Sequence, residues 1–131
     1  MSQMTITPCE GAGAEVHGVD LTALSAEDDR TIRQAFADYG VLFFRDQQMS
    51  EDAHIAFAES FGEININRFF TGHPDYPQIA VVSKDVEDKE NIGGGWHTDH
   101  SYDAEPALGS VLVARELPPK GGDTRFADMY R

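Results

Sequence analysis

The spacing of apolar residues changes at Gly62, and this change limits the folds that the chain can adopt. Before Gly62, apolar residues recur at helical spacing in two stretches. After Gly62 that spacing disappears, and short apolar runs separated by glycine, proline and charged residues follow. Two helices followed by successive strands predict an α+β fold whose second half is mainly β.

Both helices have recognisable start and stop signals. Ser25 is expected to cap the first helix, because acidic residues follow it in the first turn, where the helix dipole favours anions, and Gly40 is expected to end it. Ser50 is expected to cap a second helix whose apolar positions reach Phe61 before Gly62 stops it. The expected strands or extended segments are 5–7, 14–16, 41–44, 78–83, 96–102, 109–115 and 123–127. Residues 84–95 are charged and then glycine-rich, which predicts a mobile surface loop.

Length and charge exclude several classes of protein. The 131 residues suffice for one ordinary domain. Ten basic against 23 acidic side chains give a formal net charge of −13, which opposes binding to nucleic acid and to an anionic membrane surface. No apolar run reaches the roughly 20 residues of a membrane-spanning helix. Because Cys9 is the only cysteine and the first residues lack the pattern of a signal peptide, we expect a cytoplasmic protein.

The densest chemistry lies in Trp96–Tyr102, with the sequence WHTDHSY. On a strand, His97 and Asp99 share one face, and an imidazole and a carboxylate so placed can reach one metal ion. Two histidines and one carboxylate on one side of an ion suit non-haem Fe(II), so a second histidine would have to come from elsewhere. Taken alone, the triplet favours a structural strand with a hydrogen-bonded histidine and a solvated aspartate. A zinc site that also uses His100 is a further alternative, but strand alternation opposes it.

Several segments together resemble the taurine and chlorophenoxyacetate dioxygenases, which use Fe(II) and 2-oxoglutarate. They occur in the family's order and at compatible spacings over nearly the whole chain. The matching segments are Gly18–Leu21, Gly40–Gln47, Phe61–Glu63, Trp96–Asp99, Pro106–Ala107 with Gly109, Glu116–Pro118 and Gly121–Thr124.

The resemblance implies a fold, a reaction and site residues. The fold would be a double-stranded β-helix, a jelly roll related to cupins, with the two N-terminal helices packed outside. His97 and Asp99 would bind iron, and the hydroxyl of Thr124 would bind a carboxylate of 2-oxoglutarate. The partners would be molecular oxygen and a small organic substrate of the sulfonate or carboxylate type, which is hydroxylated while 2-oxoglutarate becomes succinate.

The same resemblance indicates which positions depart from taurine-type members. Asn67 and Phe70 stand where those members carry a histidine and a tyrosine that grip the sulfonate, and Gly93 stands in place of an asparagine. Taurine itself is therefore not the expected substrate. Arg68 could neutralise an acidic substrate, and Tyr102 could line the pocket.

The family's second iron-binding histidine and its 2-oxoglutarate-binding arginine lie well downstream of the Gly121–Thr124 segment. No histidine follows His100, and the sequence ends seven residues after Thr124. We therefore expect residues 1–131 to be the N-terminal portion of one catalytic domain, with an incomplete jelly roll and little activity alone. The alternative is a non-catalytic remnant that binds metal weakly, or that pairs with a partner chain or a second copy through an open sheet edge.

Overall fold

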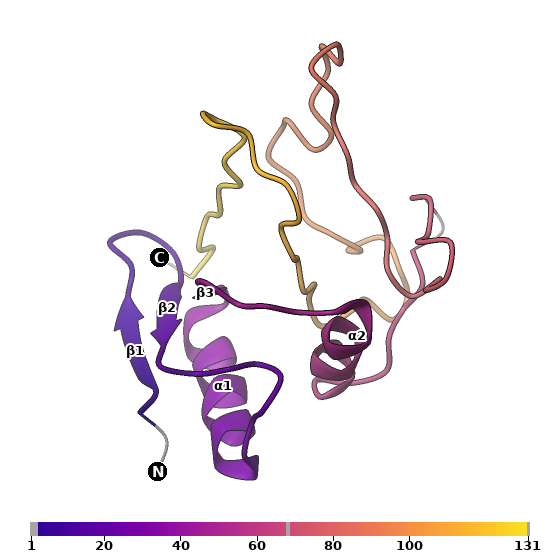
Figure 1. The fold of residues 1–131 in the computed structure, drawn as a ribbon. Helices are drawn as coiled ribbons and strands as arrows, with labels where there is room; N and C mark the ends of the chain where they lie inside the picture. The colour runs from indigo at the N-terminus through magenta and orange to yellow at the C-terminus, as the bar shows by residue number, and fades with distance from the viewer. Residues whose placement is uncertain (1–2, 68, 131) are drawn as a thin grey trace. The chain divides into compact units, whose positions relative to one another are not determined.

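The computed structural model describes residues 3–67 and 69–130. Its elements, in chain order, are β1 (Thr5–Pro8), β2 (Ala14–His17), α1 (Ala26–Tyr39), β3 (Leu42–Phe44) and α2 (Glu51–Glu59) (Figure 1). The chain divides into two compact units. Unit 1 comprises Met1–Ala53 and Val113–Arg131, and unit 2 comprises His54–Leu112. The part of the chain that the structure describes contains no helix long and apolar enough to cross a membrane.

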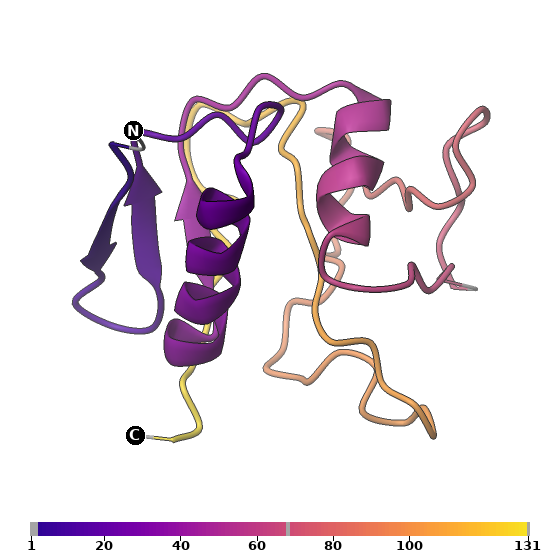
Figure 2. The same cartoon turned by 90° about the horizontal axis from the view of Figure 1, so that it is seen from below.

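Unit 1 is built on a mixed sheet with the strand order β1-β2-β3. β1 and β2 are antiparallel and pair Thr5 with His17, whereas β2 and β3 are parallel and pair Ala14 with Leu42. Both views show α1 beside this sheet (Figures 1 and 2). Gly13 permits the close approach of β2 and β3, because its φ is +89° and a Cβ there would lie 2.7 Å from the Val41 carbonyl oxygen.

The caps predicted for α1 are confirmed. The Ser25 hydroxyl accepts from the backbone N–H of Asp28 at 3.0 Å, and an Asp28 carboxylate oxygen accepts from the N–H of Ser25 at 3.1 Å. This reciprocal pair is a capping box, which satisfies two donors at the helix start. Gly40 ends the helix in the left-handed conformation, with φ at +75°.

Ser50 also begins α2 as predicted, since its hydroxyl accepts from the N–H of Ala53 at 3.2 Å. The helix ends at Glu59, so the expectation that it continues to Phe61 is wrong. The N–H of Phe61 bonds the Ala58 carbonyl at 3.1 Å, three residues back, which tightens the chain into a turn before Gly62.

The buried core lies almost entirely in unit 1. Its apolar members there are Ala14, Val16, Leu21, Ile32, Ala35 and Met49. In unit 2, Phe57 is the buried apolar side chain among the described residues, and its ring meets that of Phe61 edge-on at 5.4 Å. Unit 2 is therefore held mainly by turns and local hydrogen bonds.

The strands predicted after Gly62 do not form. Residues 78–83 make an isolated bridge, with Gly72 opposite Ala80, and residues 96–102, 109–115 and 123–127 are irregular. A strand requires a neighbouring strand to accept and donate its backbone hydrogen bonds. None of the described segments supplies that ladder for these stretches. Residues 84–95 are exposed throughout, as expected, while their mobility stays a prediction.

Candidate metal centre

His97 and Asp99 lie side by side in unit 2. The imidazole Nε2 of His97 is 3.3 Å from Oδ1 of Asp99, and the two side chains are 54% and 69% exposed. The motif therefore brings together the two side chains that its spacing suggested.

The other nitrogen of His97 determines what this pair can hold. Nδ1 of His97 lies 2.7 Å from the backbone carbonyl oxygen of Gly95. Because a carbonyl oxygen only accepts, Nδ1 carries the proton, and a neutral ring then presents a lone pair at Nε2. A lone pair and a carboxylate oxygen at 3.3 Å repel one another unless a proton or a cation lies between them. A metal-binding histidine characteristically donates its other N–H to such a carbonyl, so the residues present fit a divalent metal ion.

The local backbone differs from the strand that the sequence predicted. The hydroxyl oxygens of Thr98 and Ser101 lie 2.6 Å apart, although a strand would place these side chains on opposite faces. The reason is a turn: His100 has a φ of +55°, and the N–H of Asp103 bonds the His100 carbonyl at 3.1 Å. The pair of His97 and Asp99 thus lies on an extended entry into a turn.

His100 is engaged elsewhere. Its Nδ1 lies 3.0 Å from Oδ2 of Asp103. Within the described residues, no group of three metal-ligating side chains forms. The zinc arrangement of His97, Asp99 and His100 therefore finds no support.

Two other histidine–carboxylate pairs provide a comparison. Nε2 of His17 lies 3.2 Å from a carboxylate oxygen of Glu15, but the other oxygen of Glu15 already meets the Arg45 guanidinium at 3.1 Å. The pair of His100 and Asp103 uses Nδ1 of its histidine for the carboxylate itself. His97 differs from both, because a backbone carbonyl fixes its ring while Nε2 faces Asp99, which forms no other ion pair among the described residues.

Gly93 closes one side of His97. Its φ is +68°, and a Cβ added there would lie 3.1 Å from Cε1 of His97 and 3.7 Å from Nε2. Sequence reasoning marked Gly93 as a departure at a substrate position. Gly93 also limits the position of His97, because a side chain at residue 93 would clash with the imidazole.

The expected substrate residues lie in unit 2 but do not converge as a group. The side-chain oxygen of Asn67 accepts from the N–H of Phe69 at 2.8 Å, so Asn67 shapes its own turn. Tyr102 meets Phe69 edge-on at 5.9 Å, a partner that sequence reasoning missed. Phe70 is 37% exposed. Arg68 lies outside the described residues.

Thr124 lies in unit 1, where it is exposed and irregular. The two preceding glycines, Gly121 and Gly122, both have positive φ and turn the chain as expected. Nearby Phe126 meets Phe43 of β3 edge-on at 6.1 Å.

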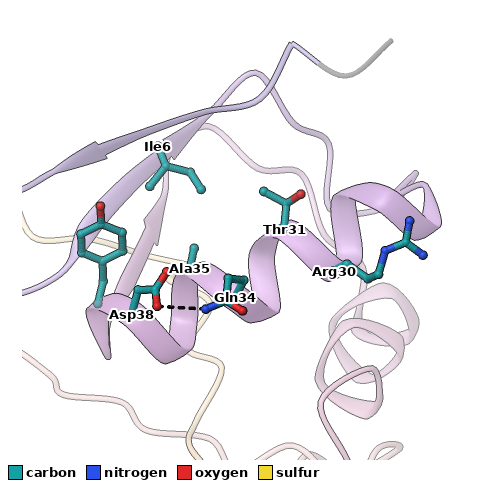
Figure 3. A pocket seen from close by; sticks show the side chains of 7 residues that line it. Ile6, Arg30, Thr31, Gln34, Ala35 and Asp38 are labelled. Carbon is teal, nitrogen blue, oxygen red and sulfur yellow. Dashed lines mark hydrogen bonds between the residues drawn. The ribbon is translucent and has the colours of Figure 1, made fainter.

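A hollow of about 480 Å³ lies elsewhere in unit 1, between β1 and α1 (Figure 3). Ile6 comes from β1, and the other lining residues are Arg30, Thr31, Gln34, Ala35, Asp38 and Tyr39 of α1. Gln34 donates to Asp38 across one helix turn at 2.9 Å. None of the predicted site residues lines this hollow.

A family model described as taurine catabolism dioxygenase TauD, TfdA family, matches residues 5–131. The chain belongs to this family. TauD/TfdA relatives include a pentalenolactone F synthase of Streptomyces arenae, which is 37% identical over 97% of this chain and 46% of its own length. An alpha-ketoglutarate-dependent 2,4-dichlorophenoxyacetate dioxygenase of Cupriavidus pinatubonensis is 34% identical over 88% of this chain and 46% of its own length. The name of this second relative describes a dioxygenase that depends on 2-oxoglutarate, also called alpha-ketoglutarate.

A solved structure of the TauD/TfdA family shares the fold. A taurine dioxygenase from Burkholderia xenovorans matches with a TM-score of 0.64 and 34% identity, over 79% of this chain and 37% of that protein. The shared portion includes the small mixed sheet and the two helices. The chain spans less than half the length of the curated relatives that it matches.

Proposed function

We propose that this chain is the N-terminal portion of a single catalytic domain, an Fe(II)- and 2-oxoglutarate-dependent dioxygenase that hydroxylates a small anionic substrate. The observation that carries the proposal is the pair of His97 Nε2 and Asp99 Oδ1, 3.3 Å apart, with Nδ1 of His97 held by the Gly95 carbonyl. Family membership supports the use of 2-oxoglutarate. A jelly roll completed by further strands is part of the proposal.

In this proposal each site residue has one task. His97 and Asp99 bind Fe(II) through Nε2 and a carboxylate oxygen, and the third protein ligand comes from outside this chain. When bound, iron with 2-oxoglutarate and oxygen supplies the oxidising chemistry that converts a C–H bond to a C–OH bond. The Gly95 carbonyl keeps the lone pair of His97 pointed at the metal position.

The remaining roles concern the two organic molecules. The hydroxyl of Thr124 donates a hydrogen bond to a carboxylate of 2-oxoglutarate. Asn67, Phe70 and Tyr102 are the proposed substrate contacts. The substrate is of the sulfonate or carboxylate type, which is supported by relatives named for sulfonates and for 2,4-dichlorophenoxyacetate. Because neither Phe70 nor Gly93 offers a side-chain hydrogen-bond donor, taurine is not the proposed substrate.

The metal pair is tested by titrating the chain with Mn(II) and measuring free Mn(II) by electron paramagnetic resonance. We expect weak binding that is lost in His97→Ala and in Asp99→Ala. His17→Ala is the matched control, because it removes an exposed histidine that also faces a carboxylate. Equal binding by the wild-type chain and both site variants would overturn the proposed metal pair.

Activity is tested through succinate formation from 2-oxoglutarate with Fe(II) and oxygen. We expect no turnover by the 131-residue chain, because it contributes two metal ligands of the three that this chemistry uses. We expect turnover by a version extended in frame to the length of its relatives. Turnover by the 131 residues alone would show that the further ligands are unnecessary.

The alternative, a non-catalytic protein that pairs with another chain, is favoured by one observation. Large apolar side chains are exposed along the second half of the chain, among them Trp96, Leu108, Leu112 and Leu117, each at 70% or more. Where exposed apolar side chains form one contiguous patch, the patch characteristically marks a surface that another polypeptide covers. Its test is the self-association experiment described in the Discussion.

A further inference from the structure

We propose that His100 is a positioning residue: held by Asp103, it fixes the turn that directs the Asp99 carboxylate toward Nε2 of His97. This inference rests on the proposed metal pair and adds a residue to it. His100 touches neither metal nor substrate in this role. It acts through the backbone of its neighbour.

The backbone at His100 is the first observation. Its φ of +55° lies in the left-handed region, which a residue with a side chain adopts infrequently. The reversal begins directly after Asp99, and the N–H of Asp103 closes it onto the His100 carbonyl at 3.1 Å. The direction of the Asp99 side chain therefore depends on this turn keeping its shape.

The side chain of His100 is the second observation. Nδ1 lies 3.0 Å from Oδ2 of Asp103, and the carboxylate can only accept, so Nδ1 donates. The two side chains are 17% and 27% exposed, while every residue from 91 to 99 is exposed. A charge-assisted bond in this less exposed position is worth more than one in open water. It offsets the cost of the left-handed backbone.

Aromatic contacts attach the turn to another part of unit 2. The imidazole of His100 lies 6.0 Å from the ring of Tyr102, and Tyr102 meets Phe69 edge-on at 5.9 Å. The turn is thus linked to residues more than 30 positions earlier in the chain. Asp99 itself is 69% exposed, so the turn provides the support that its own surroundings lack.

The substitution His100→Asn distinguishes the positioning role from direct metal binding by His100. An asparagine amide nitrogen occupies nearly the place of Nδ1 and can donate to Asp103, and asparagine tolerates positive φ. It has no counterpart of Nε2, so it cannot replace a metal-binding imidazole. Alanine removes both possibilities.

The experiment measures Mn(II) affinity in His100→Ala, His100→Asn and Asp103→Ala. His73→Ala is the matched control, because His73 also accepts a local N–H, at 3.1 Å, and faces a tyrosine ring, at 5.3 Å, within unit 2. We expect His100→Ala and Asp103→Ala to weaken binding about tenfold, as loss of a supporting contact does in other metal sites. We expect His100→Asn to restore most of the affinity and His73→Ala to leave it unchanged.

A second readout identifies the binding nitrogen. Nitrogen-15 spectra of the imidazoles, recorded with Zn(II) as a diamagnetic probe, are expected to show Nε2 of His97 shifting in the wild type and in His100→Asn. Wild-type affinity in His100→Ala would overturn the positioning role and leave the metal pair intact. Failure of His100→Asn to restore binding would also overturn it. No shift at His97 in the wild type would overturn the metal pair and the inference together.

Discussion

At the scale of single residues, Gly93 controls the room available to the His97 imidazole. We predict that Gly93→Ala weakens Mn(II) binding, because the new methyl group would lie 3.1 Å from Cε1 of His97 and the φ of +68° is strained for alanine. The measurement is the Mn(II) titration by electron paramagnetic resonance. The matched control is Gly11→Ala, whose added Cβ would meet nothing within 4 Å and whose φ is not positive. Equal losses in both variants would contradict a specific contact with His97.

Asp20 gives a prediction about pH. The Thr22 hydroxyl donates to the Asp20 carboxylate at 2.7 Å and the Thr22 N–H donates at 2.9 Å, and these bonds hold the pKa of Asp20 below its ordinary value of 3.8. A lowered pKa in the folded state stabilises the fold above the unfolded pKa, and this stabilisation is lost as the pH falls through the folded pKa.

We predict that Thr22→Val raises the pKa of Asp20 toward 3.8 without reaching it, because the backbone N–H still donates. A carbon-13 titration of the Asp20 carboxyl by nuclear magnetic resonance measures this change. Thr31→Val is the control, since the Thr31 hydroxyl bonds the Glu27 carbonyl instead. An unchanged pKa in Thr22→Val would show that the hydroxyl does not lower it.

The proximity of His97 and Asp99 was predictable from the sequence because a single residue separates them. The atoms that support the pair were not predictable. The Gly95 carbonyl belongs to the backbone, so no residue type signals its contact with His97. Asp103 contacts His100 only because the backbone turns at His100. Strand alternation placed the pair on one face correctly but failed beyond Asp99 for that same reason.

At the scale of elements, the start of α1 depends on Ser25. We predict that Ser25→Ala lowers the free energy of unfolding by about 0.5–2 kcal/mol, because it leaves an N–H at the helix start without its acceptor. Urea unfolding followed by far-ultraviolet circular dichroism measures the loss. Ser25→Asp is the control, since aspartate also caps helices well. A destabilisation of equal size in both variants would rule out capping as the cause.

Packing of α1 against the sheet gives a second prediction at this scale. Ile32 is fully buried, so Ile32→Val should lower the free energy of unfolding by about 0.5–1.5 kcal/mol through the lost methyl group. The exposed neighbour Thr31 provides the comparison, and Thr31→Ala should change stability by about 0.5 kcal/mol or less. Urea unfolding followed by far-ultraviolet circular dichroism measures the free energy of unfolding of both variants. A larger effect at Thr31 than at Ile32 would contradict the observed packing.

The helices were predictable because their signals are local: a capping serine, acidic first turns and a terminating glycine all lie within a few residues. β3 followed from its apolar run in the same way. Segments 109–115 and 123–127 were also expected as strands but are irregular in the structure. Their pairing partners are set by long-range contacts, which apolar runs alone do not specify.

At the scale of the whole molecule, exposed apolar side chains and a charge of −13 oppose each other. Apolar residues such as Leu112 and Leu117 favour association, while like charges on two copies repel. We predict concentration-dependent self-association that increases with salt, since the screening length falls from about 10 Å at 0.1 M to about 3 Å at 1 M. Sedimentation velocity at both salt concentrations tests this. A monomer under all conditions would contradict the alternative of partner pairing.

Membership of the family could be inferred from the order of short motifs along the chain. Two of those motifs do meet in the structure: the Gln47 side chain accepts from the N–H of Leu21 at 3.0 Å and donates to the Val19 carbonyl at 2.9 Å. The substrate could not be inferred. The orientation of Asn67, an expected substrate residue, depends on the bond that it accepts from the N–H of Phe69, and the motifs do not encode that bond.

The single-residue separation of His97 and Asp99 also bears on the order of assembly. Pairing β2 with β3 requires closing a loop of more than 20 residues, whereas Nε2 of His97 and Oδ1 of Asp99 approach each other with only Thr98 between their residues. The entropy of loop closure is correspondingly small for this pair. During synthesis, both donors and the turn that supports them exist as soon as Asp103 leaves the ribosome. In the proposed metal site, a further ligand would then join a pair of side chains that is already in place.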